Sequence, residues 1–101
     1  MTNKTKRVQE LPPAVAPADW TPADAAALKA LARGDATTEQ QQRALNWIIY
    51  DACGTYEVDY RPDPREHAMV SGKRHVGLQI VKLIKMPSTV MQAMTGKVRE
   101  D

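Results

Sequence analysis

The chain has 101 residues, enough for one domain, and a formal net charge of +2. Hydrophobic residues make up 43% of the chain, but aromatic residues make up only 5%, and phenylalanine is absent. Its core must therefore be built from Leu, Ile, Val, Ala and Met, and a small domain buries a reduced share of its surface. The length leaves room for one domain only. The light core favours self-association or docking on a larger partner.

Cysteine usage and hydropathy set the expected compartment. The single cysteine, Cys53, excludes an internal disulfide framework and is expected to be a small apolar filler at a helix end. The first twenty residues lack the apolar segment of a signal peptide. No apolar run approaches the roughly 20 residues that cross a bilayer. We therefore expect a protein that is made and kept in a reducing cytoplasm and has no membrane partner.

Residues 1–20 are predicted to form an extended arm. Basic residues stand at its front and prolines follow among alanines; proline has no amide donor and a fixed φ, which favours extended backbone. Such an arm does not fold alone, so an ordered arm would need something to hold it, which hints at an assembly. The candidate arm contacts are Lys4, Lys6, Arg7, Pro12 and Pro13.

The first helix is predicted to begin at Thr21, which can cap it, with Pro22 in the first helical position. Asp24 completes a variant of the capping box. Gly34 fits the residue that ends the helix.

A second helix is predicted to begin near Thr37 or Thr38, where Thr37 and Gln40 form another capping box, and to end at Gly54. Because the loop between the helices is very short, we expect an antiparallel hairpin. The apolar residues expected to be buried in the two helices are Leu28, Leu31, Ala44, Leu45, Ile48, Ile49 and Ala52, with Trp47 and Tyr50 beside them.

Residues 54–63 are interpreted as a linker. Apolar and acidic residues alternate in it with the period of a strand, but no second strand is available to pair with it, and Pro62 closes it. We expect an extended connection anchored by its aromatic residues; addition to the sheet edge of a partner is the alternative. The alternating residues are Tyr56, Glu57, Val58, Asp59 and Tyr60.

A long helix is predicted from Asp63 to about Met86, roughly 33 Å at the rise of an α-helix. Asp63 caps it, Pro64 lies inside its first turn, and Glu66 occupies the reciprocal capping position. At helical spacing it has an apolar side and a basic side. The apolar side holds Met69, Val76, Ile80, Leu83 and Ile84, and the basic side holds Arg74, Lys82 and Lys85, interrupted by Leu78.

We expect Ile80 and Leu83 of this helix to pack into the hairpin. Gly72 and Gly77 each cost about 1 kcal/mol relative to alanine inside a helix, so they indicate close helix packing or a kink. Together with Leu78 they form the candidate packing motif. Lys73 falls on the apolar side, which a bend at Gly72 or a snorkelling stem would explain.

Pro87 is predicted to end the long helix and Ser88 to cap a short one that Gly96 ends. The predicted fold class is therefore all-α, a small domain of three or four helices. Its predicted organisation is an arm at residues 1–20, a helical domain at residues 21–95 and a polar tail at residues 96–101.

Charge is distributed unevenly. Residues 64–86 carry a net charge of +4 and residues 54–63 a net charge of −2, which suggests a polyanion or an acidic protein surface as partner. A solvated helix face is the alternative. The candidate partner-binding residues are Lys73, Arg74, Lys82 and Lys85. The hairpin resembles a helix-turn-helix, but its second helix carries Glu39 and Asp51 with only Arg43, a poor recognition helix for DNA.

No arrangement of residues in the sequence indicates a catalytic or metal-binding site. His67 and His75 lie about 12 Å apart along one helix, too far to share an ion, and Cys53 lacks any zinc-type spacing. No nucleophile has a base at a recognisable spacing, and the Gly-Lys pair at residues 72–73 lacks the upstream glycine of a phosphate-binding loop. We therefore expect no catalytic, metal or cofactor site.

One pattern carries a family resemblance. Gly54 is followed by Tyr56 and Tyr60, then Asp63-Pro64, then Gly72-Lys73-Arg74-His75-Val76-Gly77-Leu78 entering an apolar helix, and Pro87 precedes a short methionine-rich helix. With it, residues 37–95 resemble a small all-helical family of tailed-bacteriophage proteins typified by a product of a Bordetella podophage. The usual form there is Gly-Arg-Arg-x-Val-Gly-Leu, so Lys73 stands where arginine is commoner.

The resemblance implies a place in the virion-structure or DNA-packaging gene module of a phage, and it brings no established enzymatic activity. The leading hypothesis is a non-enzymatic virion protein that docks on a larger component (capsid, portal, tail or ejection protein), present in the host cytoplasm during assembly and then in the virion. The alternatives are a DNA-binding packaging factor similar to a small terminase, in which the basic side meets phosphate, and an inhibitor that presents a helix to a host enzyme.

Overall fold

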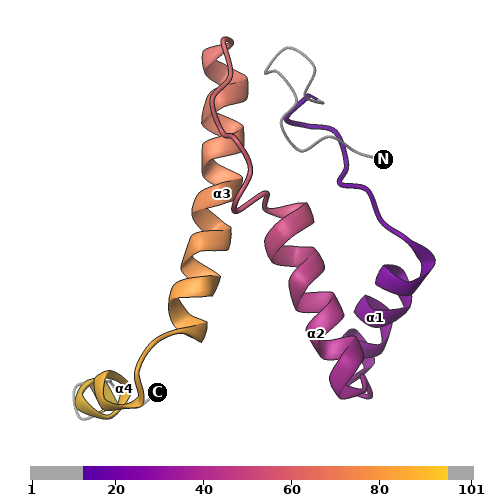
Figure 1. Cartoon of the computed structure of the whole chain (residues 1–101), viewed down its shortest axis with the longest axis vertical. Coiled ribbons are helices and arrows are strands. Elements are labelled where there is room, and N and C mark those ends of the chain that lie inside the picture. The colour runs from indigo at the N-terminus through magenta and orange to yellow at the C-terminus, as the bar shows by residue number, and fades with distance from the viewer. Residues whose placement is uncertain (1–12, 96–101) are drawn as a thin grey trace.

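A computed structural model of the chain describes residues 13–95. They form four helical segments in the order α1, α2 with its continuation η2, α3 and α4, and the described residues contain no strand (Figure 1). The predicted all-α class is confirmed. The α1–α2 hairpin and α3 meet near the middle of the chain, and α4 lies at the far end of α3 (Figure 1).

The hairpin forms as the capping residues predict. In α1 (Pro22–Arg33), the Thr21 hydroxyl accepts from the Asp24 amide and the Asp24 carboxylate accepts from the Thr21 amide, which completes the capping box. Gly34 ends the helix in the left-handed region at φ 83°. Thr37 and Gln40 form the second box at the start of α2 (Thr38–Asn46), and α1 and α2 pack against each other.

The contact between α1 and α2 is built from alanine. Ala27, Ala30 and Ala44 are buried, whereas Leu31, predicted to be buried, is exposed. Leu45 is exposed as well, and Leu28 is only partly covered. Small side chains let two helix backbones approach closely, and this approach leaves the leucines at the margins of the contact. The hairpin therefore contributes little leucine to the core.

Beyond Asn46 the second helix continues as a π-helical segment, η2 (Trp47–Ala52). Its wider turns appear in the hydrogen bond from the Cys53 amide to the Ile48 carbonyl, five residues back. Ile49 is buried on this segment and Tyr50 is exposed. The segment packs against α3, so it joins the hairpin to the long helix.

The connection from η2 to α3 is anchored by Thr55 and not by its aromatic residues. Thr55 is fully buried, and its hydroxyl donates to the Ile49 carbonyl at 2.6 Å. Tyr56 and Tyr60, the predicted anchors, are more than half exposed. The close neighbour of Thr55 is Gly77 of α3, where an added Cβ would overlap the Thr55 hydroxyl and lie 3.0 Å from the Cys53 Cβ.

Helix α3 (Pro64–Ile84) is capped by Asp63, whose carboxylate accepts from the Arg65 amide at 2.9 Å. It ends two residues earlier than predicted. The reciprocal capping role predicted for Glu66 is wrong: its carboxylate accepts from the amide of Ala14 at 3.0 Å. Glu66 therefore holds the arm and does not cap its own helix.

The part of the arm that the structure describes, residues 13–20, is held by the chain itself. Ala14 is buried; Glu66 accepts from its amide, and the Lys73 ammonium donates to its carbonyl at 3.0 Å. Further along, the Trp47 indole donates to the Asp19 carbonyl at 2.9 Å. The position of Lys73 on the apolar side of α3 is explained by this contact. An assembly partner is not needed to fix this stretch.

The distal part of the chain corrects another prediction. Leu83, expected to pack into the hairpin, is 66% exposed, and Ile80 is only partly covered. Beyond Gly77, α3 diverges from the hairpin and leads to α4 (Ser88–Thr95), all of whose residues are exposed (Figure 1). Within residues 13–95, α4 packs extensively on no other helix.

Candidate functional site

Several exposed apolar side chains lie at the end of α3 and on α4. Ile84, Met91 and Met94 are each at least half exposed, and Val90 is 43% exposed. Lys82, Lys85, Met86, Pro87 and Val90 line a shallow recess of about 360 Å³ at the bend between the helices. We call Ile84, Val90, Met91 and Met94 the distal surface.

The local sequence accounts for this geometry. Pro87 cannot continue α3, and its carbonyl accepts from the amides of Val90 and Met91, which starts α4 at a new direction. Val90, Met91 and Met94 recur at the spacing of one helix face. A helix of eight residues is marginal in water without tertiary packing. This apolar face is therefore what α4 offers to a partner.

The four candidate basic residues separate into two pairs. Lys73 donates to Ala14, and Arg74 lies 4.0 Å from the Asp59 carboxylate, so both contact the chain itself. Lys82 and Lys85 are exposed beside the distal surface. The structure thus does not bring the four residues together as one basic face. Two lysines remain at the edge of the apolar residues.

The candidate packing motif is also divided. Gly77 is buried where α3 crosses the Thr55 loop. Gly72 is exposed, and an added Cβ there would meet nothing within 4 Å. Leu78 is 38% exposed. Of the three residues of the motif, Gly77 is therefore the one that makes a close contact within residues 13–95.

Among the candidate arm contacts, Lys4, Lys6, Arg7 and Pro12 lie outside the described residues. Pro13 is exposed, and its carbonyl accepts from the Ala16 amide in a turn. The arm contacts that the structure does describe belong to Ala14 and Asp19, which sequence reasoning missed. The sequence feature that could have indicated the contact with Ala14 is Lys73, a charged residue on the apolar side of the long helix.

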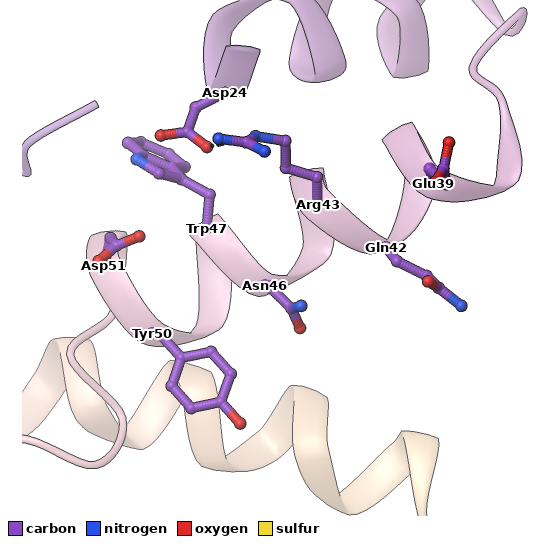
Figure 2. A pocket seen from close by; sticks show the side chains of 8 residues that line it. All are labelled: Asp24, Glu39, Gln42, Arg43, Asn46, Trp47, Tyr50 and Asp51. Carbon is purple, nitrogen blue, oxygen red and sulfur yellow. Dashed lines mark hydrogen bonds and ion pairs between the residues drawn. The ribbon is translucent and has the colours of Figure 1, made fainter. Parts of the chain in front are cut away.

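A second concave region lies on the hairpin, a polar cleft of about 410 Å³. Figure 2 shows the Asp24 carboxylate and the Arg43 guanidinium pointing toward each other side by side, with Gln42 directed away. The Arg43 Nε lies 2.9 Å from the Asp24 carboxylate. The residues that line the cleft are Asp24, Glu39, Gln42, Arg43, Asn46, Trp47, Tyr50 and Asp51.

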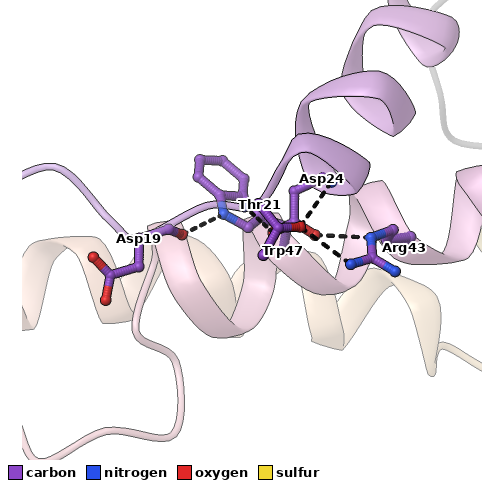
Figure 3. A network of polar contacts seen from close by, with 5 residues as sticks. All are labelled: Asp19, Thr21, Asp24, Arg43 and Trp47. Carbon is purple, nitrogen blue, oxygen red and sulfur yellow. Dashed lines mark hydrogen bonds and ion pairs between the residues drawn. The ribbon is translucent and has the colours of Figure 1, made fainter.

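The charged pair of the cleft, Asp24 and Arg43, is bonded within the chain. Arg43 also donates to the Thr21 hydroxyl, so one guanidinium ties α2 to the cap of α1 (Figure 3). The backbone hydrogen bond from Thr21 is the main reason that the pKa of Asp24 lies below its ordinary value, and Arg43 adds to this lowering. The pairing fastens the hairpin and presents no nucleophile with a base.

Asp51, at the other end of the cleft, has a raised pKa, in contrast to Asp24. Desolvation is the main cause that raises its pKa, and the negative charges of Asp24, Glu57 and Asp19 raise it further.

Among residues 13–95, no three His, Cys, Asp or Glu side chains gather closely enough to hold a metal ion. His67 instead places its Nδ1 atom 3.0 Å from the Asp59 carbonyl. In that same range, no helix combines the length and apolar character needed to cross a membrane.

Comparison with known proteins gave no match: no family model, no curated protein and no solved structure is significantly similar to the chain.

Proposed function

We propose that this chain is a non-enzymatic, virion-associated protein of a tailed bacteriophage that docks on a larger phage component through its distal surface. The observation that carries the proposal is the exposure of Ile84, Met91 and Met94, each at least half open to solvent at the end of the molecule. Met91 and Met94 share one face of α4 with Val90, and exposed apolar residues that gather on one face of a small domain commonly mark a protein-interaction site.

The energetics of α4 support the docking step. Its eight residues bury no side chain against the rest of the described chain. A partner groove that covered Val90, Met91 and Met94 would supply the packing that short helices need, in the manner of a helix laid in a groove. Methionine side chains adapt to irregular partner surfaces, which suits this role.

The lysines define the chemistry of the partner. Lys82 and Lys85 stand at the edge of the apolar residues, so the partner groove is apolar with acidic groups at its rim. The phage context comes from the resemblance of residues 37–95 to the tailed-bacteriophage family. Because Lys73 and Arg74 already contact the chain, a phosphate backbone would find only two of the four basic residues free, and we favour a protein partner over DNA.

The test uses purified particles of the phage that encodes the chain. We expect mass spectrometry to find the protein in mature particles, and the double variant Met91→Asp, Met94→Asp to be lost from them. Gln92→Asp is the matched control, because it adds a charge to another position of α4 and should leave incorporation unchanged. Absence of the wild-type protein from particles, or equal incorporation of both variants, would contradict the proposal.

A further inference from the structure

The described part of the arm is bound to α3 through the peptide groups of one residue. Ala14 is 3% exposed, the Glu66 carboxylate accepts from its amide, and the Lys73 ammonium donates to its carbonyl, both at 3.0 Å. Hydrogen bonds in which one partner is charged are stronger than those between neutral groups. We call Glu66 and Lys73 the arm seat. The seat bonds to backbone groups, and the burial of Ala14 leaves room for a small side chain only.

The backbone that the seat holds is a turn. The Ala16 amide donates to the Pro13 carbonyl at 3.0 Å, which makes Ala14 the second residue of a β-turn. That hydrogen bond leaves the amide and carbonyl of Ala14 unused, and these are the two groups that the seat takes up. Pro13 and Val15 are exposed, so their side chains add little to the recognition. The seat therefore fits other turns that have a small residue in the second position.

The arm does not fill the space beneath it. It is fixed again where the Trp47 indole donates to the Asp19 carbonyl at 2.9 Å. Between the two points of attachment, a cavity of about 490 Å³ lies between the arm and the body, and the arm lines it with the small side chains of Ala16 and Ala18. Protein interiors are close-packed, so a cavity of this size marks a loosely fitted segment.

The charge of the arm also fits poorly. Asp19 lines the cavity together with Asp51 and Glu57 of the body, so three carboxylates share it. The basic residues of its wall, Lys73 and Arg61, donate to backbone carbonyls. Desolvation raises the pKa of Asp51, and nearby negative charges, Asp19 among them, raise it further. A basic side chain in place of Asp19 would exchange this repulsion for attraction.

We propose that the arm seat is a binding site for a segment of another protein, and that the chain's own arm is a displaceable ligand of this site. The segment has a β-turn with alanine, glycine or serine in the second position and lysine or arginine five residues later, where Asp19 stands in the arm. Until such a segment is present, the arm keeps the site closed. The site does not involve Met91 or Met94, so it stands or falls separately from docking through the distal surface.

Peptide binding to the full chain tests the proposal. The probe is a fluorescein-labelled peptide with the sequence of residues 12–20 and the change Asp19→Lys, followed by fluorescence anisotropy. Ala14→Arg in the chain keeps its own arm out of the seat, because the buried alanine leaves no room for arginine. The peptide should bind Ala14→Arg about tenfold more tightly than wild type, since a tethered competitor lowers the apparent affinity.

Val15→Arg is the matched control, because it makes a similar change at an exposed neighbour and should leave peptide binding at the wild-type level. Equal binding to Ala14→Arg and wild type, or binding to neither, would overturn the proposal. Ala14→Arg should also keep the urea midpoint of wild type. Loss of the fold in this variant would show that the arm is part of the core and not a displaceable ligand.

Changes on both sides of the contact locate the peptide. In the Ala14→Arg background, Lys73→Met should weaken peptide binding about tenfold by removing the bond to the carbonyl, and Lys82→Met should not change it. Equal effects of the two would contradict the seat. A peptide that keeps Asp19 should bind about threefold more weakly than the Asp19→Lys peptide, with a difference that shrinks in salt. Equal binding of the two peptides would contradict the basic residue of the ligand.

Hydrogen exchange tests displacement in the wild-type chain. Adding the unlabelled Asp19→Lys peptide in excess to isotope-labelled wild type should speed exchange of the Ala14 amide, because that amide loses its bond to Glu66 when the arm leaves. The same peptide carrying Ala14→Arg as well should have no effect. Binding of the Asp19→Lys peptide without faster exchange at Ala14 would place it elsewhere on the chain and overturn the proposal.

Discussion

The two halves of α3 belong to one continuous helix and have opposite surroundings. In the first half, Val70 is buried, and Glu66 and Lys73 are occupied by the arm. In the second half, Leu83 and Ile84 are more than half exposed, although they are larger and more apolar than most residues that the body buries. Hydrophobicity along the helix therefore does not decide which half is enclosed.

Close approach at one position decides it. Gly77 brings α3 against Thr55 and Cys53, and the residues that pack around this crossing are small. Beyond the crossing the helix diverges from the hairpin (Figure 1), and Leu83 and Ile84 near its end are more than half exposed. A light core of this kind encloses what lies near the crossing, and the remaining apolar residues are available for other molecules.

The largest predicted effect breaks the crossing itself. Gly77→Ala places a methyl group on the Thr55 hydroxyl, which is fully buried and cannot turn away without losing its bond to Ile49. Overpacking of this kind should lower the free energy of unfolding by about 3 kcal/mol, even after the helix propensity gained by replacing glycine. Urea unfolding followed by circular dichroism measures it.

Gly72→Ala is the matched control for this prediction. It makes the same chemical change on the same helix, where the new methyl group meets nothing. It should raise the free energy of unfolding by about 1 kcal/mol. Equal effects of the two variants would mean that the crossing does not hold the body together.

Local signals in the sequence predicted the start and end of the elements well. Thr21 with Asp24, Thr37 with Gln40, Gly34 and Asp63 act as their chemistry requires, because a cap depends only on residues a few positions away. The helices and the all-α class follow from these signals together with helical periodicity.

Which apolar residues are buried could not be read from the same signals. Periodicity gives the side of a helix on which Leu31 or Leu83 lies, but not whether another element reaches it. That depends on the Gly77–Thr55 crossing and on the π-helical turn at η2, both of which arise from tertiary contacts. The distal surface does not follow from the sequence signals, which place Ile84 on the apolar side of the long helix and assign no role to Val90, Met91 and Met94. An apolar helix face beyond the reach of a short hairpin was the signal that could have found it.

A smaller effect is expected on the contact between the arm and α3. Lys73→Met keeps the length of the side chain and removes its hydrogen bond to the Ala14 carbonyl. We expect a loss of about 1 kcal/mol in the local stability of the arm, seen as faster hydrogen exchange of the Ala14 amide, with little change in global unfolding. Lys82→Met, on the exposed end of the same helix, should change neither quantity. Unchanged exchange in Lys73→Met would show that the contacts made by Glu66 and Trp47 hold the arm without Lys73.

The smallest predicted effect concerns Asp51, a carboxyl group whose pKa is raised. Since desolvation and neighbouring carboxylates raise the pKa of Asp51 above 3.8, its charge opposes folding at neutral pH. Asp51→Asn should therefore stabilise the protein at pH 7, by roughly 0.3 kcal/mol because the side chain is largely exposed. The gain should shrink as pH falls through the raised pKa of the folded state and vanish below the unfolded value.

The charge of Asp24 has the opposite effect on stability: because its pKa is lowered, it contributes stability that is lost as pH falls through the pKa of the folded state. Asp51→Asn must therefore be compared with wild type at each pH, since Asp24 is present in both proteins. Salt then separates the two causes at Asp51. Added salt screens the repulsion from Asp24, Glu57 and Asp19 but leaves desolvation in place. Because desolvation is the larger cause, most of the gain should persist in salt. If the gain disappears there, repulsion is the main cause and Asp51 is better solvated than its position on η2 implies.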